Sequence, residues 1–219
     1  MLKAIIFDMD GVLIDSTGYN FKSFNKVLEK YDVVLKNTDF LKKHLGRSLR
    51  DQLKQIEKDY NLKEEIDHDQ FSKEALKYQL EFMKHDLVPN KILHKFIAAA
   101  KKKGIKLAVA TSSPKERARI ILNSLDILNK LDTLVTCDDV IKHKPAPDVF
   151  LKAAKNLKVN PKDCVVIEDA LNGIKAAKAG KMKSVAKLNK HNKKLDFSNA
   201  DLIFSDFNKL KLSDLEKLF

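Results

Sequence analysis

The stretch IIFDMDGVLIDS, residues 5–16, decides the fold because it changes character within a few positions. It begins as an apolar run typical of a buried strand, and Asp8 and Asp10 follow at its end, with Gly11 next. Strand side chains at i and i+2 point the same way, so both carboxylates are expected to reach one site if strand geometry persists. Two carboxylates this close either raise the pKa of at least one of them or attract a cation. Gly11 permits a sharp turn of the backbone after them. A surface turn is the alternative, whereas a calcium loop is disfavoured because apolar residues follow.

Five further runs share this strand-like character, because they are rich in Val and Ile and do not alternate with polar residues. They occupy residues 106–111, 133–138, 164–169, 183–188 and 201–206. Helix-like segments alternate with these runs, over residues 90–103, 115–124, 148–157 and 172–179. Buried strands that alternate with helices predict a parallel sheet covered on both faces, so the expected fold class is α/β.

Residues 16–88 break this alternation, because they contain no convincing strand. Aromatic and aliphatic residues instead recur there at helical spacing. We therefore expect a core of residues 1–15 and 89–219 and an inserted helical domain of residues 16–88. An insertion after the first strand lies over the carboxyl ends of the strands, where ligands bind in open α/β sheets.

The composition indicates a globular protein, with 44% apolar residues among 219. The net charge of +12 comes from scattered lysines, without an arginine stripe or a nucleic-acid motif. A solvated lysine-rich surface is therefore favoured over a nucleic-acid site, and a weak preference for small anions fits either reading. The basic stretch 189–196 is expected to be a solvated loop.

The same composition bears on compartment and partners. No apolar run approaches the roughly 20 residues that span a bilayer, and the N-terminus lacks a signal-peptide cleavage pattern. We expect a cytoplasmic protein without membrane contact, and a monomer by default. Cys137 and Cys164 lie in strand-like runs and are expected to be reduced core residues, so a zinc site is not favoured.

Polar residues follow three of the later strand runs. Thr111 and Ser112 precede a helix whose N-terminus can hold an anion, Lys144 precedes a proline-fixed turn, and Glu168 and Asp169 end the fourth run. Each group also has a simpler interpretation. Thr111 and Ser112 could cap a helix, Lys144 could be a solvated surface lysine, and Glu168 and Asp169 could be acidic residues at the start of a helix. All three groups of polar residues follow predicted strands. This shared position favours one common site at the same edge of the sheet.

Together with the two N-terminal acids, these residues form an inventory suited to phosphoryl transfer. One Asp can serve as nucleophile and the other as acid and base. The acids can hold a hard cation, for which magnesium is expected. A fixed lysine and backbone N–H donors then neutralise charge on the transferred group.

Four segments in order, FDMDGVL (7–13), VATSS (109–113), HKPAPDVF (143–150) and IEDALNGIKAAKAG (167–180), resemble the motifs of the haloacid dehalogenase-like superfamily. The resemblance extends over essentially the whole chain and is nearest to the β-phosphoglucomutase-like phosphatase branch. It implies a Rossmann-like parallel-sheet core with an inserted helical cap domain.

The resemblance also implies roles for the site residues. Asp8 would attack phosphorus and become an aspartyl-phosphate, while Asp10 would protonate the leaving oxygen and then activate water. Thr111 and Lys144 would bind the phosphoryl oxygens. The implied ligands of Mg²⁺ are Asp8, the backbone carbonyl of Asp10 and Asp169, with Glu168 close by.

The inserted domain departs from the mutase pattern. Asn20 stands where β-phosphoglucomutases carry a cap-proximal His, and Leu49 replaces a substrate-binding Arg. Candidate substrate-binding residues, besides Ser112 in the core, are Asn20, Gly46, Arg47, Ser48 and Arg50. The two arginines either bind an anion or face water.

These departures favour a magnesium-dependent phosphatase acting on a small phosphorylated metabolite, of sugar phosphate or phosphoglycolate type. One alternative is a β-phosphoglucomutase, which interconverts glucose 1-phosphate and glucose 6-phosphate. An alternative of another class is a basic nucleic-acid-binding protein on an inactive scaffold.

Overall fold

A computed structural model describes residues 1–40, 49–62, 65–84 and 86–219. The chain divides into two compact units. The core unit comprises Met1–Asp15 and Leu87–Phe219, and the helical unit comprises Ser16–Asp86. Among the described residues, no helix is both long enough and apolar enough to cross a membrane.

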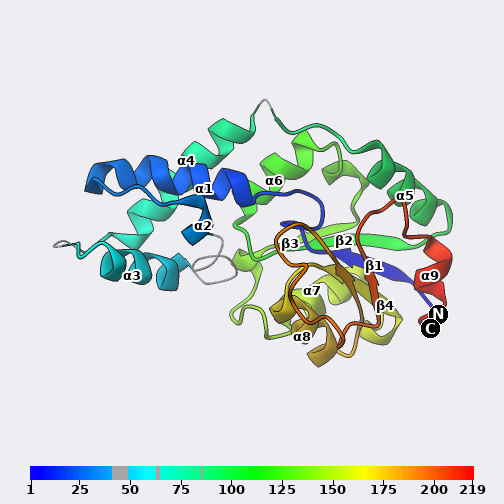
Figure 1. Ribbon diagram of the computed structural model, residues 1–219. Helices are drawn as coiled ribbons and strands as arrows, with labels where there is room; N and C mark the ends of the chain where they lie inside the picture. Colours follow the sequence, from blue (N-terminus) through cyan, green and yellow to red (C-terminus); the bar gives the residue numbers. More distant parts are fainter. Residues whose placement is uncertain (41–48, 63–64, 85) are drawn as a thin grey trace. The chain divides into compact units, whose positions relative to one another are not determined.

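The core unit is built on a six-stranded sheet in the order β3-β2-β1-β4-β5-β6, with all neighbours parallel (Figure 1). The strands are β1 (Ala4–Phe7), β2 (Lys106–Ala110), β3 (Thr133–Val135), β4 (Cys164–Glu168), β5 (Lys183–Lys187) and β6 (Leu202–Phe204). Phe7, the last residue of β1, pairs with Val109 and Ile167. The three central strands therefore end level with one another, and the residues that follow them share one edge.

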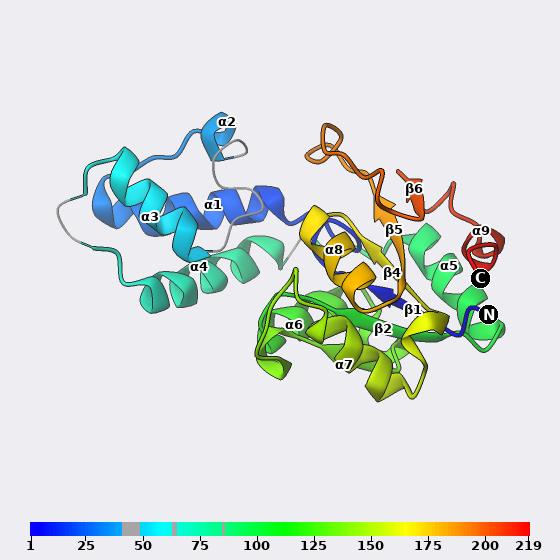
Figure 2. The ribbon, with the colours of Figure 1, turned by 90° about the horizontal axis from the view of Figure 1, so that it is seen from below.

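Helices connect these strands, as Figure 2 shows from below. The connecting helices are α5 (Lys91–Lys102), α6 (Lys115–Ser124), α7 (Asp148–Leu157) and α8 (Leu171–Ala179), and α9 (Leu212–Glu216) follows the last strand. The side chains of β1 alternate between two layers. Ala4 and Ile6 join a cluster with Phe150 of α7, whereas the ring of Phe7 lies 6.4 Å from those of Phe96 in α5 and Phe207.

A strand buried on both faces cannot alternate apolar and polar residues, which explains its continuous apolar sequence. The predicted α/β class is confirmed, including the parallel sheet. One detail differs, because β3 ends at Val135 and Cys137 lies half-buried in a 3₁₀ turn instead of in the sheet. Cys164 is buried in β4, and both thiols are free.

The helical unit has a hydrophobic core of its own. Its helices are α1 (Thr17–Leu28), α2 (Asn37–Asp39), α3 (Leu49–Asp59) and α4 (His68–Met83). The ring of Phe24 in α1 lies 5.6 Å from that of Phe40 and 5.1 Å from that of Phe71 in α4. The predicted helical insertion after the first strand is confirmed.

Candidate active site

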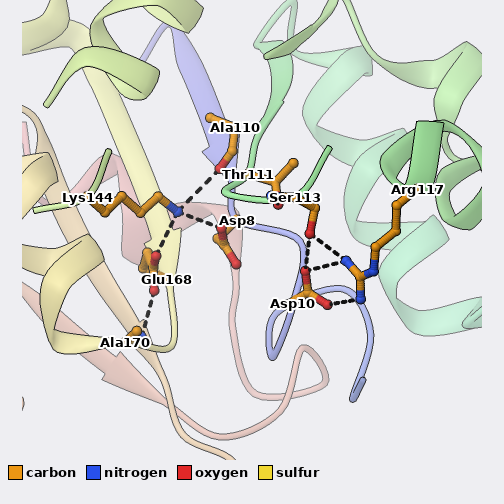
Figure 3. A network of polar contacts seen from close by, with 9 residues as sticks. All are labelled: Asp8, Asp10, Ala110, Thr111, Ser113, Arg117, Lys144, Glu168 and Ala170. Atoms are coloured by element: carbon orange, nitrogen blue, oxygen red, sulfur yellow. Dashed lines mark hydrogen bonds and ion pairs between the residues drawn. The ribbon is translucent and has the colours of Figure 1, made fainter. Parts of the chain in front are cut away.

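Asp8 directly follows β1, and its carboxylate belongs to a network of three side chains, the Asp8 network of Asp8, Lys144 and Glu168 (Figure 3). The backbone N–H of Asp8 donates to the carbonyl of Ile167, which extends the pairing between β1 and β4 by one residue. The residue is 6% exposed. Burial, then the charges of Glu168, Asp169 and Asp10, raises the pKa of Asp8 well above its usual value, although Lys144 opposes the shift.

Lys144 supplies the cation of this network from the loop before α7. Its Nζ donates to Asp8 Oδ1 at 2.6 Å and to Glu168 Oε1 at 2.9 Å, and the side chain is 8% exposed. Burial alone lowers the pKa of a lysine, but here the carboxylates of Asp8 and Glu168 outweigh it and raise the pKa of Lys144. A permanent positive charge therefore lies beside the candidate nucleophile.

Glu168 and Asp169 stand at the end of β4. Oxygen atoms of Asp8, Glu168 and Asp169 lie within 4.8 Å of one another, which suits a divalent cation with oxygen ligands. Burial, then the charge of Glu168, raises the pKa of Asp169 to about 7. One lysine does not neutralise three close carboxylates, so the donor set fits a bound cation. The backbone carbonyl of Asp10 remains a predicted fourth ligand.

Two glycines leave the space that these acids occupy. A Cβ atom on Gly11 would collide with the carboxylate of Asp169, and one on Gly173 would collide with that of Glu168. Gly11 also has a φ of +78°, which side chains rarely allow. The glycine that follows the DxD motif is therefore required both by the turn and by the acid beside it.

The side chain of Asp10 does not join Asp8, contrary to the expectation from strand geometry. β1 stops at Phe7, and Asp10 instead forms an isolated bridge with Ile14, so the two-residue alternation is lost. The carboxylate lies in a second network, the Asp10 network of Asp10, Ser113 and Arg117 (Figure 3).

Arg117 contacts Asp10 and was not among the predicted site residues. Its guanidinium donates to Asp10 Oδ1 at 2.7 Å and to Oδ2 at 2.8 Å, and its side chain is only 7% exposed. Ser113 Oγ donates to the same Asp10 Oδ2 at 2.9 Å. A signal was present, since Arg117 shares the buried face of α6 with Ile121. An arginine in an apolar stripe needs a buried partner.

Thr111 and Ser112 differ in their surroundings. Thr111 is buried, and its Oγ1 accepts the backbone N–H of Ser113 at 3.1 Å, which shapes the turn before α6. Ser112 is exposed. The N-cap of α6 is Pro114, whose side chain makes no capping bond, so the helix-cap reading of this pair is not what the structure shows.

Two of the candidates in the insertion are described. Asn20 lies in α1, where its Oδ1 accepts a hydrogen bond from the buried Gln79 of α4. Arg50 is exposed on the first turn of α3. Gly46, Arg47 and Ser48 lie outside the described residues.

The stretch 189–196 is more than a solvated loop, which corrects the prediction. Asn192 is 4% exposed, and Asn189 Nδ2 donates to Asp169 Oδ2 at 2.8 Å. A stretch rich in Lys and Asn has the composition of a solvated surface loop. Composition alone therefore did not predict a contact with a residue as distant in sequence as Asp169.

The fold and this edge define an α/β enzyme with a buried lysine among strand-end carboxylates. The sequence pattern of haloacid dehalogenase-like hydrolases matches residues 5–187, and the chain belongs to this family. It is 32% identical to the phosphorylated carbohydrates phosphatase of Thermotoga maritima, over 81% of each chain. It is 33% identical to β-phosphoglucomutase of Bacillus subtilis, over 84% of this chain and 82% of the relative.

A solved structure agrees with these relatives. The β-phosphoglucomutase of Clostridium difficile superposes with a TM-score of 0.82 at 29% identity, covering 100% of this chain and 97% of that one. The protein is accordingly a hydrolase of the phosphatase type. Its family and its acidic cluster both point to a divalent cation.

Proposed function

We propose that the protein is a Mg²⁺-dependent phosphatase that hydrolyses a small sugar phosphate through an aspartyl-phosphate at Asp8. One observation carries this proposal. The carboxylates of Asp8, Glu168 and Asp169 meet within 4.8 Å, and the Nζ atom of Lys144 bonds two of them. Such a site combines an anionic nucleophile with positive charge for phosphoryl oxygens.

Asp8 and Lys144 perform the first half of the reaction. An Asp8 oxygen forms a bond to phosphorus while the bond from phosphorus to the leaving oxygen breaks. Lys144 already contacts Asp8, so its ammonium neutralises the transferred group and the nucleophile together. Asp8, Asp169 and the backbone carbonyl of Asp10, with Glu168 nearby, would hold Mg²⁺, which when bound would further neutralise the phosphoryl oxygens.

Asp10 handles the protons in both halves. On leaving Arg117, Asp10 takes up a proton from solvent and gives it to the leaving oxygen. It then takes a proton from the water that attacks phosphorus, and this attack breaks the bond from phosphorus to the Asp8 oxygen and releases inorganic phosphate. Its carboxylate lies on Arg117 and Ser113. To reach the leaving oxygen it must exchange part of these bonds for substrate, so Arg117 fixes the position from which Asp10 starts.

The test is phosphate release across a panel of phosphorylated sugars and phosphoglycolate, with Mg²⁺ or with a chelator. We expect turnover of at least one sugar phosphate, dependence on Mg²⁺, and none in Asp8→Asn. An acid-quenched reaction with radiolabelled substrate should carry label on the protein that hydroxylamine removes, as an acyl phosphate requires. Turnover retained in Asp8→Asn would contradict the proposal.

A second candidate, β-phosphoglucomutase, is favoured by the 33% identity to the Bacillus subtilis enzyme. A mutase gives a different product from a phosphatase. With a bisphosphate activator present, it converts β-glucose 1-phosphate to glucose 6-phosphate without net release of phosphate. Asn20, bonded to Gln79, stands where the mutases carry His and speaks for the phosphatase. A coupled glucose 6-phosphate assay beside the phosphate assay separates the two.

A further inference from the structure

We propose that Asn189 is a positioning residue for the cation site, which orients the Asp169 carboxylate before the cation binds, and that Asn192 anchors the backbone beneath it. This inference rests on the proposed Mg²⁺ site. Neither asparagine belongs to one of the four family motifs. Both lie in the loop after β5, beyond the last motif residue, Gly180.

The two asparagines hold Asp169 at two points. Asn189 Nδ2 donates to Asp169 Oδ2 at 2.8 Å, and Asn192 Nδ2 donates to the backbone carbonyl of Asp169 at 2.8 Å. Asn192 also donates to the carbonyl of Lys187 at 3.0 Å, at the end of β5. The loop therefore ties the residue after β4 to the end of the neighbouring strand.

The amide of Asn189 is fixed in its orientation. Its Oδ1 accepts the backbone N–H groups of His191 at 2.8 Å and Asn192 at 3.2 Å. The backbone N–H of Asn189 donates to Asn192 Oδ1 at 2.8 Å. A flipped amide would place its NH₂ group against two N–H donors, so the Nδ2 atom must face Asp169. The donor is thus held in place before any ligand arrives.

The chemistry of the partner matters as well. A neutral amide fixes one oxygen of Asp169 without cancelling its charge, which leaves the other oxygen for a cation. Lys187, the last residue of β5, donates from its Nζ to the carbonyl of Gly11 at 3.1 Å. Partners that orient ligating carboxylates in this way typically change metal affinity 10–100-fold when removed.

The experiment titrates the full protein with Mg²⁺ alone by calorimetry and records thermal unfolding of the metal-free protein. Asn189→Ala should weaken Mg²⁺ binding about 10–100-fold. Asn189→Ser is the second variant, because Ser keeps an acceptor for the local turn but is too short to reach Asp169. It should retain the wild-type unfolding temperature and still bind Mg²⁺ more weakly.

Asn160→Ala is the matched control, since Asn160 also caps a turn of the core unit, through Lys162 N–H at 3.0 Å. Its Mg²⁺ affinity should equal that of the wild type. Unchanged affinity in Asn189→Ser would overturn the inference while leaving the proposed function intact. A wild-type protein that binds no Mg²⁺ would overturn the proposed function, and the inference with it.

Discussion

Asp8 and Asp10 are separated by one residue, yet their carboxylates lie in different networks (Figure 3). Asp8 shares one lysine with Glu168, and a third carboxylate stands close by. Asp10 accepts a two-pronged contact from the guanidinium of Arg117. The Asp8 network therefore carries excess negative charge that a cation can satisfy, whereas the Asp10 network is balanced within the chain.

This difference assigns the two regions different tasks. The negative charge of the Asp8 network is only partly neutralised by Lys144. This excess charge favours the binding of a cation, which neutralises it. A group that moves protons gains from a fixed resting position. The following changes disturb one network at a time.

The largest effect is expected for Asp8→Asn, which removes the nucleophile but keeps an oxygen for Lys144. Phosphate release should fall by at least about 10⁴-fold, measured under saturating substrate. The unfolding temperature of Asp8→Asn should equal that of the wild type. The loss of activity would then come from the missing nucleophile and not from a damaged fold. An enzyme that still labels covalently would mean that another residue accepts the phosphoryl group.

Lys144→Met should reduce kcat by about 10²–10³-fold, because the transferred group loses its fixed cation. The variant also leaves the acids of the Asp8 network unpaired, at a cost of about 3–5 kcal/mol in the free energy of unfolding. Mg²⁺ should restore part of that stability, as measured by urea unfolding with and without the ion. The exposed Lys142 provides the control, as Lys142→Met. If Lys144→Met lost the same free energy of unfolding with and without Mg²⁺, the Asp8 network would not carry excess negative charge that a cation can neutralise.

Arg117→Met tests the Asp10 network, with Arg119→Met on the exposed face of α6 as control. We expect kcat to fall roughly 10-fold or more with little change in KM, since Asp10 loses its fixed position. Added guanidinium should restore part of the activity of Arg117→Met and none of that of Lys144→Met. No response of kcat to the variant would show that Asp10 finds its place without Arg117.

The smallest effect concerns pH. Burial, then Glu168, raises the pKa of Asp169 to about 7 from an ordinary value near 3.8, so the folded chain binds more protons than the unfolded chain between these values. The contribution of Asp169 to metal-free stability is therefore present below pH 4 and is lost as pH rises to about 7.

Asp169→Asn stays neutral, so its unfolding temperature relative to the wild type should increase over the same pH range. Mg²⁺ should reverse the order, because it stabilises only the ionised wild-type carboxylate. A difference between the two proteins that does not change with pH would mean that burial and the charge of Glu168 do not raise the pKa of Asp169.

The sheet and its edge were predictable because their signals are local. An unbroken apolar run such as CVVI, residues 164–167, indicates a doubly buried strand, and polar residues at the ends of parallel strands share an edge. Lys144 and Glu168 followed from this rule without knowledge of any contact, and the structure places both against Asp8.

The remainder depends on contacts between segments that no periodicity links. Asp10 leaves the strand pattern after β1 ends, so its direction depends on the turn at Gly11 and on an arginine more than a hundred residues away. The contact from Asn189 to Asp169 depends on how a loop folds back, which its polar composition does not encode.

The central position of β1 has a consequence for synthesis on the ribosome. Its hydrogen-bonding neighbours, β2 and β4, are Lys106–Ala110 and Cys164–Glu168. At about 5–20 residues per second, β4 is translated on the order of 10 s after β1. Throughout that interval the apolar segment Ala4–Phe7 lacks at least one of its two pairing strands, while the helical unit, whose core is built from residues of Ser16–Asp86, can already fold. Nascent chains that stop short of β4 should therefore be the ones that chaperones bind.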